Sequence, residues 1–301
     1  MMKKFSYGSI LLAGIFIFSG CFRDESEELK EKEQLKLNQY LENHNITREP
    51  TASGLYYIPI TDTVGLSPTI DDVVEFDYTG TLIDGLVFGT TDSAIAKDKN
   101  IYYESIVYGP VRLILSKAIA GLAEGFQLME EGERAQMILP SDIAYDGSSI
   151  GLIPRYATLI FDIQLHHVIT DPEAYEQNLI EEFLDSNNYD VTPTESGLYY
   201  IEEDPGDSVL IKNGNVVDVY YTGYFLDGRV FDSNLEDDYP LSLSLPNEYL
   251  IDGWNEGLML MSNGSKGTLI IPYDLAYGEN GTSVIGPYMT LVFDIRIVDV
   301  R

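Results

Sequence analysis

The sequence predicts an α+β protein made of two tandem modules, each a bent antiparallel β-sheet wrapped around one short helix, with a helical linker between them. The hexapeptide SGLYYI occurs at Ser53–Ile58 and again at Ser196–Ile201, 143 residues later. The tripeptide YTG repeats at the same spacing, at 78–80 and 221–223. Motifs that recur in the same order indicate a duplicated unit. Strand-like alternation fills most of each copy, which favours a sheet packed on a single helix.

The second half of each copy repeats at a spacing of 132 residues. Gly121 and Gly253 each begin a GxxxG segment, and the closing stretches LIFD and LVFD begin at Leu159 and Leu291. The change of spacing places about 11 extra residues in the first copy, between Phe88 and Gly121. The two copies are otherwise colinear.

Local patterns assign the elements within each copy. DVVEFDYTG and VVDVYYTG alternate apolar and polar residues, as do ATLIFDIQL and MTLVFDIRI, so all four are predicted strands. The Asp84-Gly85 and Asp227-Gly228 dipeptides supply the positive φ that a tight hairpin needs. GLAEGFQLM and GWNEGLMLM place apolar residues at i, i+4 and i+7, which predicts a short helix.

Residues 1–20 are predicted to be a lipoprotein signal peptide. Two lysines precede an apolar run that is too short to span a bilayer, and FSGC ends it. This ending resembles the lipobox of bacterial lipoproteins, which implies lipidation of Cys21 and a membrane anchor there. An unlipidated secretory signal and an uncleaved anchor are the alternatives. Cys21 is the only cysteine, so no internal disulfide can form.

Two charged segments are predicted to be helical. Residues 21–50 are interpreted as an acidic helical spacer, and residues 170–192 as the helical linker with a helix start near Pro172. The alternative is that both are solvated linkers. The modules themselves are assigned to residues 51–169 and 193–301. The net charge of −31 argues against nucleic acid and anionic lipid surfaces as partners.

The motifs of both copies, in their order and spacing, resemble the FKBP-type peptidyl-prolyl cis-trans isomerases. VYYTGYFLDGRVFDSN, LIDGWNEGLMLMSNGSKGTLIIPYDLAYGENG and YMTLVFDIRIVDV carry the resemblance in the second copy. FDYTGTLIDGLVF, IAGLAEGFQLMEEGERAQMILPSDIAYDG and IPRYATLIFDIQL carry it in the first. The resemblance implies two FKBP-like domains and rotation of X-Pro bonds in an apolar aromatic pocket, with no cofactor and no metal.

In the second copy the resemblance assigns the residues of a more intact pocket. Trp254 is the expected floor, Phe231 and Phe293 are the walls, Tyr277 donates to a substrate carbonyl, and Tyr221 holds the acid Asp232, which polarises the site. Leu250, Ile251 and Ile285 are the expected substrate-binding residues beside them. Gly286 stands where the family usually has proline, which is expected to loosen the loop over the pocket. The alternative is that the aromatic residues are ordinary core residues of a β module.

The first copy departs from the family at the pocket. Gly89 replaces the acid, Leu122 replaces the tryptophan, and Asp146 replaces a glycine. The expected substrate-binding residues that remain are Tyr78, Phe88, Ile119, Tyr145, Ile153 and Phe161. We therefore expect this domain to bind peptides weakly or to act as a spacer, while the second domain catalyses.

Two other motifs lack the context that their chemistry needs. Gly147–Gly151 matches GxSxG, but a nucleophile elbow needs a strand before the serine and a helix after it, and neither is predicted here. His166 and His167 are neighbours on a predicted strand and point to opposite faces, so they do not share a metal.

These inferences together predict an isomerase and folding chaperone for proline-containing exported polypeptides at the bacterial cell envelope. Phe22 stands where an inner-membrane retention signal has aspartate, which favours the outer membrane. A non-catalytic protein-binding or assembly lipoprotein is the alternative. The oligomeric state is left open.

Overall fold

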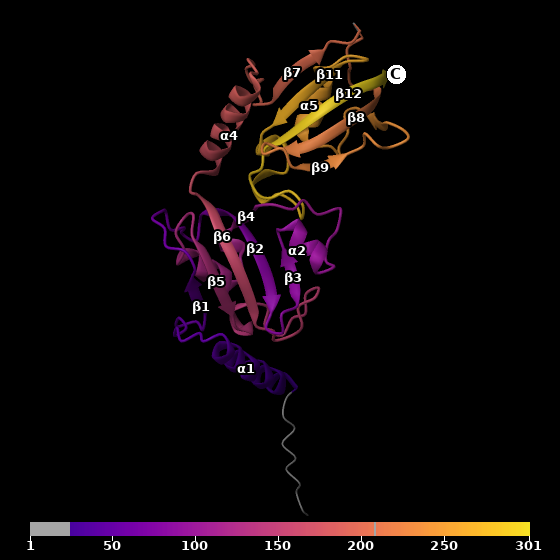
Figure 1. Ribbon diagram of the computed structural model, residues 1–301. Coiled ribbons are helices and arrows are strands. Elements are labelled where there is room, and N and C mark those ends of the chain that lie inside the picture. Colours follow the sequence, from indigo (N-terminus) through magenta and orange to yellow (C-terminus); the bar gives the residue numbers. More distant parts are fainter. Residues whose placement is uncertain (1–24, 208) are drawn as a thin grey trace, which may run out of the picture.

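The computed structural model describes residues 25–207 and 209–301, and in this part the chain forms two similar units stacked end to end (Figure 1). The first unit consists of α1 (Glu25–Asn43), β1 (Tyr56–Pro59), β2 (Val73–Leu82), β3 (Val87–Thr90), α2 (Ser93–Asp98), β4 (Val111–Ile114), α3 (Ala120–Gln127), β5 (Arg134–Leu139) and β6 (Leu159–Ile169). The second consists of α4 (Pro172–Asn187), β7 (Tyr199–Asp204), β8 (Val216–Phe225), β9 (Val230–Ser233), β10 (Leu241–Ser244), α5 (Asp252–Met259), β11 (Lys266–Ile271) and β12 (Leu291–Val300). Short 3-10 turns follow β4, β5 and β11, and a further one, η4 (Gly278–Asn280), precedes β12.

Each unit is built on one antiparallel six-stranded sheet. The strand order is β1-β5-β6-β2-β3 in the first unit, with β4 also paired to β2, and β10-β8-β12-β11-β7 in the second, with β9 also paired to β8. The long strands β2 and β8 lie next to the central strands β6 and β12, and each pairs along its other edge with two short strands in succession. This architecture confirms the predicted α+β class.

One short helix fills the hollow of each sheet. Phe126 of α3 and Leu258 of α5 are fully buried in the two cores. The GxxxG glycines let the helix approach the sheet, since a Cβ on Gly257 would lie 2.3 Å from the side chain of Leu269 in β11. The predicted Asp-Gly hairpins are also confirmed, because Gly85 and Gly228 have φ values of 88° and 85°.

The helices α1 and α4 cover the outer faces of the two sheets. Leu37 of α1 is buried against Ile138 and Ile160, and Ile180 of α4 is buried against Ile270. The helix α1, which lies within the predicted spacer of residues 21–50, therefore packs on the first unit. The linker helix begins at Pro172 as predicted, and besides connecting the units it completes the second one.

The membrane-related predictions lie at the N-terminus. Residues 1–20 and Cys21 are outside the described residues. Among residues 25–301, apart from 208, no helix is long and apolar enough to cross a membrane.

The tyrosine hydroxyls of the first strand in each unit give a test of the packing. Tyr57 donates to Glu133 at 2.5 Å, whereas the hydroxyl of its repeat equivalent Tyr200 is buried and has no hydrogen-bond partner among residues 25–207 and 209–301. We expect Tyr200→Phe to stabilise the protein by about 1 kcal/mol at pH 7, because it removes an unsatisfied buried group. As the matched control, Tyr57→Phe is expected to cost about 2 kcal/mol, because it leaves Glu133 without that bond.

The same tyrosine makes stability depend on alkaline pH. Burial, and after it the nearby Glu202 carboxylate, raises the pKa of Tyr200 to about 12. Between pH 10 and pH 12 the unfolded chain loses this proton while the folded chain keeps it, so stability falls as pH rises. Urea unfolding of Tyr200→Phe should show a smaller fall over this range than the wild type. An equal fall in both proteins would contradict this assignment.

Candidate functional site in the second unit

Four aromatic side chains meet on the helix side of the second sheet, and we call them the second aromatic site: Tyr221, Phe231, Trp254 and Phe293. Trp254 of α5 lies edge-to-face against Tyr221 of β8 at 5.1 Å and against Phe293 of β12 at 5.2 Å, between ring centroids. Phe231 of β9 lies edge-to-face against Phe293 at 5.5 Å. Trp254 and Phe293 are 4% and 5% exposed, while Tyr221 and Phe231 are half-buried. The arrangement has an apolar floor and partly open sides.

A β-bulge brings Phe231 into this site. Pairing of β8 with β9 shifts after Gly223↔Asp232, so Phe231 is the extra residue before the next pair, Tyr224↔Val230. A bulge can turn adjacent side chains toward the same face, which alternation alone does not allow. Gly223 makes the site possible, because a Cβ there would lie 2.7 Å from ring atoms of both Phe231 and Phe293.

An acid is held at the edge of the aromatic site. The hydroxyl of Tyr221 donates to Oδ2 of the exposed Asp232 at 2.6 Å. Burial and this hydrogen bond raise the pKa of Tyr221 above its ordinary value, so the phenol keeps its proton through neutral and mildly alkaline pH. Tyr221 thus fixes the carboxylate in place.

The remaining predicted residues border the aromatic site. Leu250 and Ile251 pack against its core from the segment before α5, and Ile285 is buried there from the loop before β12. Tyr277 is 44% exposed and lies near Tyr221. Within the described part of the chain its hydroxyl has no hydrogen-bond partner, so it can donate to a bound group.

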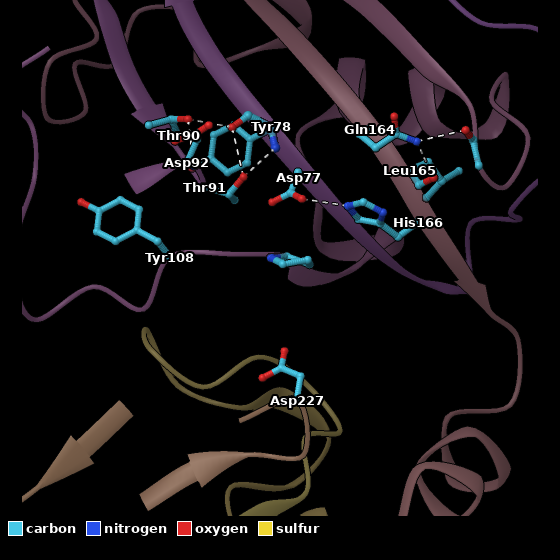
Figure 2. A network of polar contacts seen from close by, with 12 residues as sticks. Asp77, Tyr78, Thr90, Thr91, Asp92, Tyr108, Gln164, Leu165, His166 and Asp227 are labelled. Atoms are coloured by element: carbon cyan, nitrogen blue, oxygen red, sulfur yellow. Dashed lines mark hydrogen bonds and ion pairs between the residues drawn. The ribbon is translucent and has the colours of Figure 1, made fainter. Parts of the chain in front are cut away.

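The strand segment that carries the site tyrosine is fixed in the same way in both units. The backbone N–H of Tyr78 donates to Oγ1 of Thr91 at 3.0 Å, and Thr90 donates to the carbonyl of Tyr78 at 3.1 Å (Figure 2). In the second unit the N–H of Tyr221 donates to Oδ1 of Asn234 at 2.7 Å. Residues at and just after the ends of β3 and β9 therefore hold the tyrosine backbone.

The first unit contains a reduced version of the site, which we call the first aromatic site: Tyr78, Phe88 and Phe161. Phe88 and Phe161 lie edge-to-face at 5.5 Å, and Tyr78 lies 6.1 Å from Phe161. Ile153 is buried in the same core, and Ile119 and Tyr145 pack on its edge.

The first aromatic site differs in its floor and in its polar edge. Leu122 stands in place of Trp254, and the core below is filled by Phe76 and Phe126, whose rings lie 4.7 Å apart. Gly89 stands in place of Asp232, and within the described residues the hydroxyl of Tyr78 has no hydrogen-bond partner. This unit therefore has aromatic walls but no held acid.

Sequence reasoning did not single out Gly80 and Gly223, which make room for the aromatic rings. A glycine in the middle of an otherwise alternating strand, present in both copies, was the available signal. Phe76 and Phe126 were expected on the apolar faces of a strand and a helix, but not beneath the first aromatic site; they occupy valine and leucine positions of the second copy.

The two histidines of β6 lie apart from both sites. His166 contacts Asp77 at 2.8 Å, as Figure 2 shows, and His167 lies 3.9 Å from Glu131. Within the described ranges, no three His, Cys, Asp or Glu side chains are grouped so that they could hold a metal ion.

The fold and the sites define a class of two-unit α+β protein in which each unit wraps a sheet around one helix and carries an aromatic site beside it. The family model for FKBP-type peptidyl-prolyl cis-trans isomerases matches residues 65–166 and 208–298, which are more than half of the chain. The protein therefore belongs to this family.

Relatives of known sequence cover parts of the chain. A probable FKBP-type isomerase of Haemophilus influenzae is 42% identical over 113 residues, which are 37% of this chain and 46% of the relative. The isomerase FkpA of Escherichia coli is 37% identical over 131 residues, 44% of this chain and 47% of the relative. FKBP10 of Bos taurus is 29% identical over 230 residues, 76% of this chain and 34% of the relative. The chain thus spans less than half the length of each of these relatives.

Among solved structures, the crystal structure of FkpA from Escherichia coli is similar to one part of the chain. It is 37% identical, covers 44% of this chain and 60% of its own, and has a TM-score of 0.39.

Proposed function

We propose that the second unit is a peptidyl-prolyl cis-trans isomerase, and that the protein acts on proline-containing exported polypeptides at the bacterial cell envelope. The observation that carries the proposal is the second aromatic site, with Asp232 held at its edge by Tyr221. Family membership and the named relatives support the same reaction. The location rests on the N-terminal sequence, with lipid attachment at Cys21 and a preference for the outer membrane.

The chemistry needs an environment and not a nucleophile. The barrier to rotation about an X-Pro bond is about 18–20 kcal/mol and comes from amide resonance. The twisted transition state has lost this resonance and is less polar than the planar amide. A proline ring that packs on Trp254, between Phe231 and Phe293, would be shielded from water. Because water favours the more polar planar amide, this site would stabilise the twisted form relative to the planar one.

The polar groups at the rim would orient the peptide. Tyr277 is 44% exposed and would donate its hydroxyl to a substrate carbonyl. Asp232 would polarise the twisted carbonyl–nitrogen unit from the edge of the site. Leu250, Ile251 and Ile285 would contact the residues that flank the proline.

A second candidate function is supported by the first unit. Phe76 and Phe126 fill the core beneath its site, and Gly89 provides no acid. We propose that this unit binds peptides weakly or acts as a spacer. If the second unit were also inactive, the protein would be a non-catalytic binding or assembly protein.

The test is the rate of cis-to-trans isomerisation of Leu-Pro and Phe-Pro tetrapeptides, measured with the purified wild type and with Asp232→Ala. We expect strong acceleration by the wild type and a loss of about tenfold in kcat/KM in the variant, because one polar group acts on the transition state. Glu195→Ala, at an exposed acid in the loop before β7 of the same unit, is the matched control and should retain activity. If isomerisation with a folded wild type is as slow as the uncatalysed reaction, which takes tens of seconds or longer, the result would favour the binding function.

A further inference from the structure

The loop between η4 and β12 of the second unit lies against the first unit. Ile285 of this loop is buried in the same apolar core as Trp254 and Phe293, so the position of the loop shapes the second aromatic site. At the adjacent Gly286, a Cβ would lie 3.4 Å from the Cβ of Arg112 in β4. The glycine that replaces the family's proline therefore stands where the first unit reaches the edge of this site.

Arg112 is a buried cation that joins the two units. Its guanidinium pairs with Glu75 of β2 at 2.9 Å and with Glu176 of α4 at 2.6 Å, and Nη1 also donates to the carbonyl of Tyr288 in the loop at 2.9 Å. The side chains of Arg112 and Glu176 are 5% and 4% exposed. Burial alone would lower the pKa of Arg112, but the carboxylates of Glu176 and Glu75 outweigh it and the pKa is raised. The guanidinium is therefore charged.

Glu176 extends this connection to the end of the loop. Its Oε2 accepts from the N–H of Thr290, the residue before β12, at 2.7 Å. In the first unit Glu33 of α1 accepts from the N–H of the equivalent Thr158 at 2.9 Å. The contact between helix and loop thus occurs within each unit. In the second unit, Arg112 of the first unit makes an additional contact to both the helix and the loop.

Other contacts dock the same surfaces. Lys117 donates to the side-chain oxygen of Asn280, at the start of the loop. From the β8–β9 hairpin, Arg229 donates to the carbonyl of Pro110 at 3.0 Å, with its Nε held by Asp227 at 2.7 Å. Figure 2 shows Asp227 facing the strands of the first unit. The loop is therefore held from the first unit at both of its ends.

We infer that Arg112 is a positioning residue for the second aromatic site, and that the first unit acts by holding the loop of residues 281–290 so that Ile285 stays in place. As far as catalysis is concerned, this inference rests on the proposed function. A loop that is already ordered loses less entropy when a peptide binds. Loss of Arg112 should therefore raise KM more than it lowers kcat.

The first test is hydrogen exchange of the loop amides in Arg112→Met, measured on the full protein. Amides of Thr282, Ile285, Tyr288 and Thr290 donate hydrogen bonds within or from this loop. We expect their exchange to become at least about tenfold faster, while α5 and β11 keep their protection. Unchanged exchange of the loop in the folded variant would overturn the inference.

The matched control is Arg301→Met. Arg301 pairs with Asp218 of β8 and donates to Ser242 of β10. Asp218 is the repeat equivalent of Glu75, and Ser242 is the repeat equivalent of Arg112. No hydrogen bond or ion pair joins Arg301 to the loop among the described residues. This variant should leave exchange of the loop unchanged. Equal acceleration in both variants would show a general loosening of the sheet and contradict the assignment.

The second test is the kinetics of the Leu-Pro peptide. Arg112→Met should raise KM by about three- to tenfold and change kcat by less than about twofold, and Arg301→Met should change neither. A wild type without activity would refute the proposed function, and loop exchange would still decide the role of Arg112. If Arg112→Met fails to fold, Arg112→Lys and Lys117→Ala replace it, and wild-type exchange of the loop in both would overturn the inference.

Discussion

Replacing Trp254 with leucine, the residue that the first unit has at this position, is expected to reduce kcat/KM for Leu-Pro and Phe-Pro peptides by at least about tenfold, or about 1.4 kcal/mol in transition-state stabilisation. The indole is the floor of the second aromatic site and contacts both Tyr221 and Phe293. Leucine keeps the site apolar, but the proline ring of the substrate then has no flat surface to pack on. The smaller side chain also lets water into the site. Because the indole is 4% exposed, the variant should also lose about 2 kcal/mol of stability.

A control is needed to separate the effect of lower stability on activity from the effect of removing the indole from the site. Phe126→Leu is the matched control, because Phe126 is a fully buried aromatic residue of α3 whose repeat equivalent is already Leu258. Both variants should be destabilised to a similar extent in urea unfolding, but only Trp254→Leu should lose activity. Wild-type kcat/KM in folded Trp254→Leu would contradict the role of the indole.

The strand and helix pattern of this protein was predictable because each element is repeated. The hexapeptide SGLYYI illustrates the reason, since its leucines, Leu55 and Leu198, are fully buried in equivalent places. Its serines also bond equivalent helix residues, Ser53 to Glu124 and Ser196 to Glu256. Where local pattern and tertiary contact agree in both copies, the sequence is sufficient to predict the element.

Contacts between elements were less predictable. Along α1 only Leu37 is buried, so the charged pattern of this helix gave little sign that it packs on the sheet. Arg112, Glu176 and Tyr288 are far apart in the sequence and come together only when the two units dock. Gly286 was therefore interpreted as a loosened loop, whereas the structure places it against the first unit.

The second large effect is expected from Gly223→Ala. Its Cβ would lie 2.7 Å from ring atoms of Phe231 and Phe293, so one or both rings must move out of the second aromatic site. Overpacking of this kind costs about 1–3 kcal/mol and changes the shape of the site. The equivalent Gly80→Ala places a Cβ 2.4 Å from the ring of Phe88, which disturbs the first aromatic site in the same way.

These two variants form a matched pair, because each adds one methyl group at the same position of a different unit. Gly223→Ala should reduce kcat/KM by at least about tenfold, and Gly80→Ala should leave it within about twofold of the wild type. Thermal unfolding checks that both variants are folded at the assay temperature.

The claim that the second unit carries the isomerase activity is tested most directly by one experiment. It measures the cis-to-trans isomerisation rate of the Leu-Pro peptide with the wild type, Gly223→Ala and Gly80→Ala. We expect acceleration by the wild type and by Gly80→Ala, and little by Gly223→Ala. Equal losses in the two variants, or a loss in Gly80→Ala alone, would contradict it.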